Sequence, residues 1–392
     1  MSHLSWATMQ SFQNKPHYAI LDGLRGVAAL MVIAYHVFEC FDWTPLPHGY
    51  LAVDFFFVLS GFVIGYAYDD RWNRGLTVGA FFKRRLIRLH PMVIMGALFG
   101  TICYFLQGGV RWDGTSASPG WVMVAMLLGM LMLPLYPGAA ADVRGNGELF
   151  PLNGPSWSLF FEYVGNILYA LLLRRLPTRW LAVAAGASGC ALACIAVGDG
   201  YLGVGWSMVN GGLWTGLVRM LFPYTMGMLM ARVFRPVKGV HGIFWICGLM
   251  ILMVGCLPLV VSELQPWQSG LYDALCVILV FPCLVWLGAS QLSVSGATRH
   301  VSHFLGELSY PLYAIHYPLM YLFYAHIGFD GNLVPIAVMN DVWPVAVALP
   351  IACILLAWLC WRFYDRPVRS YFMKASKSIQ HRASNANSDD SM

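Results

Sequence analysis

The first long apolar segment carries two side chains that could do chemistry, Arg25 and His36. They are eleven residues apart, and eleven steps of about 100° end about 20° past three full helical turns. Both therefore lie on one helix face, about 16 Å apart along its axis. Imidazole exchanges protons near neutral pH, and an arginine inside a membrane faces the protein interior. The segment predicts an acid–base histidine and a deep arginine along one interior path.

Two carboxylates and a second arginine are expected at the depth of His36. Counting from the ends of the apolar segments places Asp54, Glu162 and Arg219 within about 10 Å of the same surface. We expect one cluster with His36, in which Arg219 is the counter-ion that makes buried carboxylates tolerable. For Asp54, a simple anchor at the interface remains an alternative.

The segment before the third apolar stretch carries Arg84, Arg85, Arg88 and then His90. Arg85 and Arg88 are three residues apart on one helical face, and two guanidiniums so placed suit the binding of phosphate groups. The alternative is that these residues only mark a cytoplasmic loop.

Other polar residues of the apolar segments can be placed by depth. Glu307 is about as shallow as Arg25, and we expect the two to pair. Ser60 and His316 fall nearer the middle of the membrane. For His316, a hydrogen bond between helices remains an alternative.

The elements that position these residues follow from composition. The chain has 392 residues, 58% apolar and 11% charged, with a mean hydropathy of +0.62. Soluble domains carry roughly 25% charged residues. An all-α, polytopic membrane protein is predicted, which excludes soluble enzymes and nucleic-acid binders. The ten cysteines lie mostly in apolar segments. The sequence contains no CxxC or HExxH pattern, so no metal site is predicted.

Ten membrane spans are predicted, and a further apolar stretch at 121–136 is short and followed by Pro134 and Pro137. The positive-inside rule places both termini in the cytoplasm only if 121–136 re-enters on the outer side. The chain divides into a cytoplasmic segment 1–19, a transmembrane domain 20–373 and a disordered tail 374–392. The predicted spans are 20–41, 51–68, 91–107, 156–173, 181–197, 212–231, 241–261, 271–289, 304–325 and 343–362.

This layout favours transfer of a group across the membrane, from a phosphate-bearing donor held inside to an acceptor reached from outside. A carboxylate-oriented imidazole can take a proton from a hydroxyl as that hydroxyl attacks a carbonyl carbon. The residues alone leave a rival open, a proton-coupled transporter of an acidic solute that uses the same charges as a relay.

The residues also carry a resemblance to a known family. The run LDGLRGVAALMVIAYHV (21–37) resembles the first helix of the membrane acyltransferase-three family of sugar and small-molecule O-acyltransferases. Further matches follow in the family's order along nearly the whole chain. They are VDFFFVLSGFVI (53–64), KRRLIRLHPM (83–92), PSWSLFFEYVGN (155–166), LGELSYPLYAIHYPL (305–319) and YDRPVR (364–369).

The resemblance implies a ten-helix acyltransferase that uses acyl-CoA, commonly acetyl-CoA, and no metal. It carries over His36 as catalytic base with Arg25 as motif partner, Arg85 and Arg88 as the donor-binding pair, and Glu162 as the acidic residue of WSLxxE. The closing motif reads Asp-Arg-Pro where the family often has Glu-Lys-Pro. Some members carry an added esterase domain, for which this chain has no room.

The leading hypothesis is an inner-membrane O-acyltransferase for a polysaccharide or lipid-linked sugar, acting by direct attack on the thioester. A covalent route through Ser60 or His36 is an alternative, as is a small-metabolite acceptor. A separate periplasmic or polysaccharide-assembly partner, and contact with membrane lipid, are expected. The expected site residues are His36, Arg25, Asp54 and Glu162 for catalysis, Arg84, Arg85, Arg88 and His90 for the donor, and Ser60, Arg219, Tyr310 and His316 for the substrate.

Overall fold

The computed structural model describes residues 17–41, 44–239, 241–257, 265–292, 294–328, 337 and 339–375. The predicted segments 1–19 and 374–392 lie almost wholly outside these residues, and so does the predicted disorder of the tail. Within the described part the chain is helical, with two isolated β-bridges and no longer strand. The predicted all-α, polytopic class is confirmed.

Ten helical elements correspond to the ten predicted spans. Two are composite: α10 runs through a π-helical turn at Cys276–Val280 into α11, and α12 meets α13 at His316. The others are single helices, the last ending in a second π-helical turn at Trp361–Asp365. The bounds are α2 Ala19–Phe38, α3 Ala52–Trp72, α4 Val78–Leu106, α6 Ser156–Leu171, α7 Thr178–Asp199, α8 Gly212–Val233, α9 Ile243–Cys256, α10 Pro266–Leu275, α11 Phe281–Ser290, α12 Gly296–Ile315, α13 Tyr317–Ile327 and α14 Met339–Cys360.

Seven helices of the described residues are long and apolar enough to cross a membrane by length and composition. Of the other predicted spans, α9 has only 14 residues, and α8 and α12 carry buried or charged polar side chains. Such side chains lower the mean hydropathy of these helices. They are compatible with a membrane-spanning helix because they face the interior of the bundle. The protein is a multi-pass membrane protein.

The apolar stretch predicted to re-enter forms one short helix, α5 (Pro119–Met130), of 12 residues. At 1.5 Å per residue it is about 18 Å long, short of the roughly 30 Å of a hydrocarbon core. It packs beside α4, and the chain then runs without long helices to Ser156. This geometry fits a hairpin that returns to the same side.

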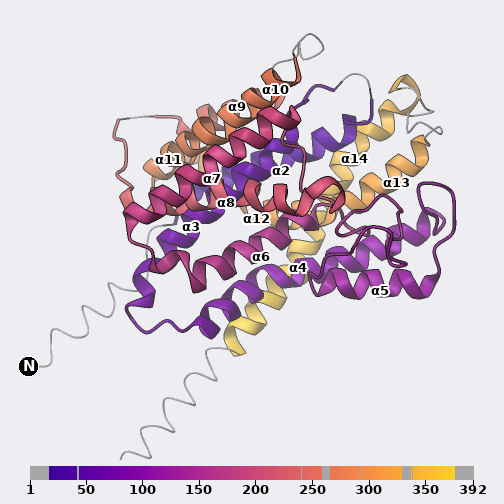
Figure 1. Ribbon diagram of the computed structural model, residues 1–392, viewed down its shortest axis with the longest axis horizontal. Helices are drawn as coiled ribbons and strands as arrows, with labels where there is room; N and C mark the ends of the chain where they lie inside the picture. The colour runs from indigo at the N-terminus through magenta and orange to yellow at the C-terminus, as the bar shows by residue number, and fades with distance from the viewer. Residues whose placement is uncertain are drawn as a thin grey trace, which may run out of the picture.

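Figure 1 shows the helices side by side in one bundle, with α5 at one edge next to α4. The start of α2 and the end of α14 lie at the same end of the bundle. Ten crossings require this arrangement, since an even number returns the chain to the side where it began.

Glycines set the closest helix crossings. A Cβ on Gly61 of α3 would lie 2.0 Å from the Tyr224 carbonyl oxygen of α8, and one on Gly227 of α8 would lie 2.1 Å from the Val58 carbonyl oxygen. Only glycine permits backbones to approach this closely, as is common between membrane helices. The α3–α8 crossing holds Asp54 and Arg219 at a fixed separation.

Candidate active site

A cavity of about 760 Å³ opens between the arginine-rich ends of the helices. Its wall comes mainly from α2, α3, α4, α6 and α12. Among the described residues, six arginines line it against three carboxylates, so its field is positive and suits an anionic ligand. The charged residues of this wall are Arg25, Arg71, Arg85, Arg88, Arg299, Arg369, Asp22, Glu162 and Glu307.

Arg25 is fixed by three contacts near the mouth of this cavity. Its Nη1 lies 3.1 Å from Asp22 Oδ1, its Nε donates to Ser309 Oγ at 2.7 Å, and its Nη2 donates to the Gly306 carbonyl at 2.9 Å. The expected pair with Glu307 is wrong. Glu307 also lines the cavity, but it accepts a hydrogen bond from Trp361 Nε1 at 2.8 Å.

Arg85 and Glu162 form an ion pair inside the cavity, from Nη2 to Oε1. Ser60 Oγ donates to the same carboxylate oxygen at 2.6 Å. Arg85 is largely buried, whereas Arg88 is exposed at the mouth. The two arginines predicted to bind the donor thus both line the cavity, one held in an ion pair and one exposed where a ligand can reach it.

Two other predicted donor residues lie elsewhere. Arg84 is exposed and outside the cavity wall. His90 is also outside it, with Nδ1 3.2 Å from the Tyr163 hydroxyl. Tyr310 does line the cavity, and its hydroxyl donates to the Leu89 carbonyl.

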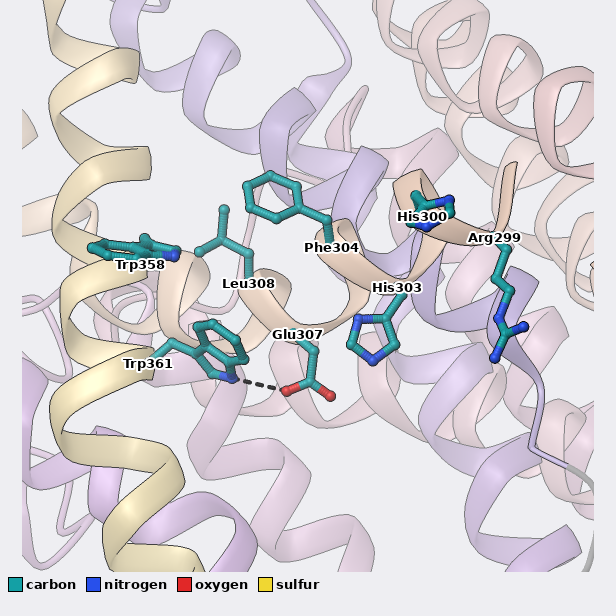
Figure 2. A pocket seen from close by; sticks show the side chains of 8 residues that line it. All are labelled: Arg299, His300, His303, Phe304, Glu307, Leu308, Trp358 and Trp361. Atoms are coloured by element: carbon teal, nitrogen blue, oxygen red, sulfur yellow. Dashed lines mark hydrogen bonds between the residues drawn. The ribbon is translucent and has the colours of Figure 1, made fainter. Parts of the chain in front are cut away.

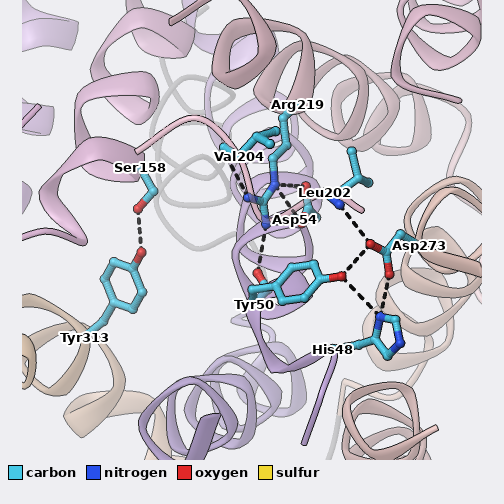
Figure 3. Close-up of polar contacts among 9 residues, drawn as sticks. All are labelled: His48, Tyr50, Asp54, Ser158, Leu202, Val204, Arg219, Asp273 and Tyr313. Atoms are coloured by element: carbon cyan, nitrogen blue, oxygen red, sulfur yellow. Dashed lines mark hydrogen bonds and ion pairs between the residues drawn. The ribbon is translucent and has the colours of Figure 1, made fainter. Parts of the chain in front are cut away.

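A pair of hydroxyl groups, from Ser158 and Tyr313, also lines the cavity. Ser158 stands in the first turn of α6 and Tyr313 in the last turns of α12, and their oxygens are 2.6 Å apart. Ser158 Oγ also donates to the Pro155 carbonyl at 3.0 Å, so the Tyr313 hydroxyl is the donor within the pair. Figure 3 shows the two side chains pointing toward one another.

Two imidazoles follow Tyr313 in the packing of the bundle, and neither belongs to the cavity wall. The Tyr313 ring lies 5.7 Å from the ring of His316, and His316 stacks on His36 at 5.6 Å. His316 is fully buried, and its Nδ1 lies 2.9 Å from the Tyr313 carbonyl, so that nitrogen carries the proton. Its Nε2 has no hydrogen-bond partner among the described residues.

His36 is oriented by a carboxylate that the sequence argument missed. Its Nδ1 lies 2.7 Å from Glu39 Oε1, and Tyr324 donates to the same oxygen at 2.6 Å. With Nδ1 engaged, Nε2 is the nitrogen that can act on a substrate. About 17% of the His36 side chain is exposed, so the imidazole is reachable. The i, i+3 spacing of His36 and Glu39 was the available signal.

The expected cluster of His36 with Asp54 and Glu162 is wrong, because each of the three has its own partner. Asp54 accepts from Arg219 Nη2 at 2.8 Å and from Nε at 3.0 Å, and Glu162 pairs with Arg85. Depth counting fixes height along an axis and says nothing about which face a residue occupies. His36 faces α12 and α13, whereas Asp54 faces α8.

Arg219 is the counter-ion of Asp54, and it also links α8 to two other segments of the chain by hydrogen bonds. It also donates to the carbonyls of Val204 and Tyr50, each at 2.9 Å. Figure 3 shows this arrangement beside a second one, in which Asp273 accepts from Tyr50 and contacts His48. Arg219 and Asp54 are at most 2% exposed, and neither is part of the cavity wall. Their geometry suits a structural role.

Comparisons with known proteins point to one chemistry. The family model described as an acyltransferase domain matches residues 18–362. Acyltransferase MdmB of Streptomyces mycarofaciens is 27% identical over 343 residues, which cover 80% of this chain and 81% of that protein. Protein 2 in picA locus of Rhizobium radiobacter is 40% identical over 162 residues, 39% of this chain and 81% of that protein.

A shorter match concerns peptidoglycan O-acetyltransferase OatA of Listeria monocytogenes. It is 43% identical over 75 residues, which cover 19% of this chain and 11% of that protein. No solved structure matches the chain.

Proposed function

Because the chain belongs to the acyltransferase family whose domain spans residues 18–362, we propose that it moves an acyl group, preferably acetyl, from acyl-CoA to a hydroxyl of a carbohydrate or lipid-linked sugar. The enzyme is an acyltransferase of the membrane, and this sets aside the transporter alternative. The donor, the acceptor and the histidine base are the proposal.

The arginine-lined cavity is the observation that supports acyl-CoA as the donor. Its volume of about 760 Å³ lies within the roughly 300–1,000 Å³ of small-molecule sites. Acyl-CoA carries phosphate groups at one end and a thioester at the other end of a long arm. Arg88 and Arg25 suit the phosphates, and the arm then extends toward Ser158 and Tyr313.

At that end the chain supplies groups for attack on a thioester. The Tyr313 hydroxyl gives up its hydrogen bond to Ser158 and turns its single proton to the thioester carbonyl oxygen as negative charge develops there. His36 Nε2 takes the proton of the acceptor hydroxyl while its oxygen bonds to the carbonyl carbon. The carbon–sulfur bond breaks, and the CoA thiolate leaves toward the arginines. Glu39 stabilises the resulting imidazolium.

The two substrates approach from opposite ends in this proposal. Acyl-CoA is cytosolic, so the arginine end faces the cytoplasm, both termini are cytoplasmic, and the membrane is the inner membrane. The acceptor reaches His36 from the other side. The OatA match supports an acetyl donor group and a saccharide acceptor, and a separate polysaccharide-assembly protein is a suitable partner for delivering the acceptor.

Calorimetry of acetyl-CoA with the detergent-purified protein tests the proposal. Saturable binding is expected, weakened at least tenfold in Arg88→Ala and in Arg85→Ala/Arg88→Ala, a loss of about 1.4 kcal/mol. Arg88→Ala is the safer variant, because Arg85→Ala leaves Glu162 without its partner. Arg84→Ala is the matched control outside the cavity. The donor assignment fails if wild type does not bind, or if Arg84→Ala weakens binding as much as Arg88→Ala does.

A further inference from the structure

A second, smaller cavity lies between α12 and the end of α14. It has a volume of about 370 Å³. Figure 2 shows two tryptophans of α14 on one side and basic side chains of α12 on the other. Trp361 stands in the π-helical turn that ends α14, a distortion frequent at functional sites. The lining residues are Arg299, His300, His303, Phe304, Glu307, Leu308, Trp358 and Trp361; they define what we call the α12–α14 groove.

One end of the α12–α14 groove is basic. Arg299, His300 and His303 occupy the first turns of α12, and all three are exposed. Within the described residues no ion pair involves Arg299 or His303. Glu307 offsets part of this charge, but one of its oxygens already accepts from Trp361. This end of the groove therefore suits a ligand with a negatively charged group.

The other end of the groove is apolar and continues along α14. Phe304 is 50% exposed and Trp358 39% exposed. Leu355 and Ile351 are also exposed, and the spacing of 351, 355 and 358 places the three on one helix face. From Trp358 to Ile351 this face runs about 10 Å, a large part of one leaflet of the hydrocarbon core.

We propose that the α12–α14 groove binds an anionic phospholipid. Its headgroup phosphate lies between Arg299 and His303, and one acyl chain follows Trp358, Leu355 and Ile351. Basic pockets between membrane helices on the cytoplasmic side bind such headgroups. A nucleotide is disfavoured here, because it would leave the aromatic and aliphatic wall of the groove exposed. An acyl chain covers this wall.

The lipid would also border the larger cavity. Arg299, His303 and Glu307 line both cavities, so a lipid in the groove closes the side of the larger one toward the bilayer. The inference depends on which end of the bundle faces the cytoplasm and is independent of which acyl donor is used.

Native mass spectrometry can count lipids retained on the protein. The protein is reconstituted in nanodiscs that contain equal amounts of phosphatidylglycerol and phosphatidylcholine. It is then released from the nanodiscs, and the amounts of the two lipids that stay bound are compared. Wild type is expected to keep one phosphatidylglycerol in preference to phosphatidylcholine. His300→Ala/Trp358→Ala is expected to reduce that retention at least fivefold, because both residues line only the groove. Arg179→Ala/Trp180→Ala removes an exposed basic–tryptophan pair elsewhere and is expected to retain the lipid.

Two additions separate the sources of phosphate. Soluble glycerol 3-phosphate in millimolar excess is expected to leave the retained lipid in place, since it lacks an acyl chain. Acetyl-CoA is expected to bind His300→Ala/Trp358→Ala as it binds wild type. The proposal is overturned if both headgroups are retained equally, if the groove variant keeps its phosphatidylglycerol, or if acetyl-CoA displaces the lipid and the variant loses acetyl-CoA binding.

Discussion

The arginine-lined cavity and the surroundings of His36 are built for different tasks. The arginine end is a wide cavity with more guanidiniums than carboxylates, and Arg88 is exposed there. At the His36 end, the imidazole is held between a carboxylate, a tyrosine hydroxyl on that carboxylate and a second imidazole. Free charge attracts a ligand, whereas a satisfied network fixes geometry. The first end is organised for binding and the second for orientation.

The largest expected effect separates these two tasks. His36→Ala removes the proposed base, and kcat is expected to fall about 10³-fold, within the range for general-base catalysis. Acetyl-CoA binding is expected to stay within about twofold, because His36 is outside the cavity wall. Release of CoA thiol in proteoliposomes supplied with cell-envelope saccharide measures kcat, and calorimetry measures binding.

His241→Ala changes an exposed histidine outside the cavity wall and is the control for the loss of an imidazole. A His36→Ala variant that binds acetyl-CoA tenfold more weakly would break the comparison, since both ends would then serve binding.

The second prediction contrasts two arginines. Arg219→Leu leaves Asp54 charged and fully buried, which is expected to cost about 3–5 kcal/mol of stability. Arg88→Ala is expected to change stability by about 0.5 kcal/mol or less, because its side chain is exposed at the mouth. Unfolding by SDS titration measures both.

Asp54→Asn/Arg219→Leu is expected to recover much of the loss, since no unpaired charge remains. Equal stability of Arg219→Leu and wild type would show that the pair is not structural, and would return Arg219 to the list of substrate-binding residues.

The sequence predicted the helices better than it predicted the contacts. Apolar length places spans reliably, because a bilayer demands about 20 residues and satisfied backbones. All ten predicted spans have a helical counterpart, with boundaries shifted where a helix leaves the apolar core. The predicted start of the third span at residue 91 is late: α4 already begins at Val78, since its first turns carry the arginines and are not apolar.

Contacts depend on how helices are rotated against one another, which the depth of a residue does not give. The depth of Asp54, Glu162 and His36 along their helices predicts similar heights, yet they face α8, Arg85 and α13 respectively. Arg25 pairs within its own helix, with Asp22, for the same reason. Ser158 and Tyr313 lie 155 residues apart, and no local pattern joins them.

A smaller effect tests the orienting network. Glu39→Gln keeps an oxygen that can accept from His36 Nδ1 but loses the charge that stabilises the imidazolium. We expect kcat to fall about 10²-fold with unchanged acetyl-CoA binding. Tyr324→Phe removes a hydroxyl that contacts Glu39 and the His36 carbonyl but keeps the Glu39 charge; it is the graded comparison and should cost less. A Glu39→Gln variant with wild-type kcat would show that Glu39 has a structural role at the end of α2 and does not assist His36 in catalysis.

The smallest expected effect concerns the segment between α5 and α6, beside the His36 end. Glu148 is buried, where it accepts from the Tyr321 hydroxyl and from Asn146 Nδ2 at 2.7 Å. Burial raises the pKa of the Glu148 carboxyl, while the nearby Arg144 guanidinium opposes this shift. Its stabilising contribution is therefore complete below the ordinary pKa of a glutamic acid and is lost as the pH rises through the raised folded-state value.

Wild type should accordingly lose stability between about pH 5 and about pH 8 by an amount that Glu148→Gln removes, since the amide stays neutral. SDS-titrated unfolding at both values measures the difference. Aspartates and histidines elsewhere titrate in both proteins, so the comparison between the two isolates Glu148. A wild type that gains stability over this range relative to Glu148→Gln would mean that Arg144 keeps the carboxylate charged. The segment between α5 and α6 would then hold a compensated ion pair like that of Asp54 and Arg219, and the orienting end would rest on charge as much as on neutral hydrogen bonds.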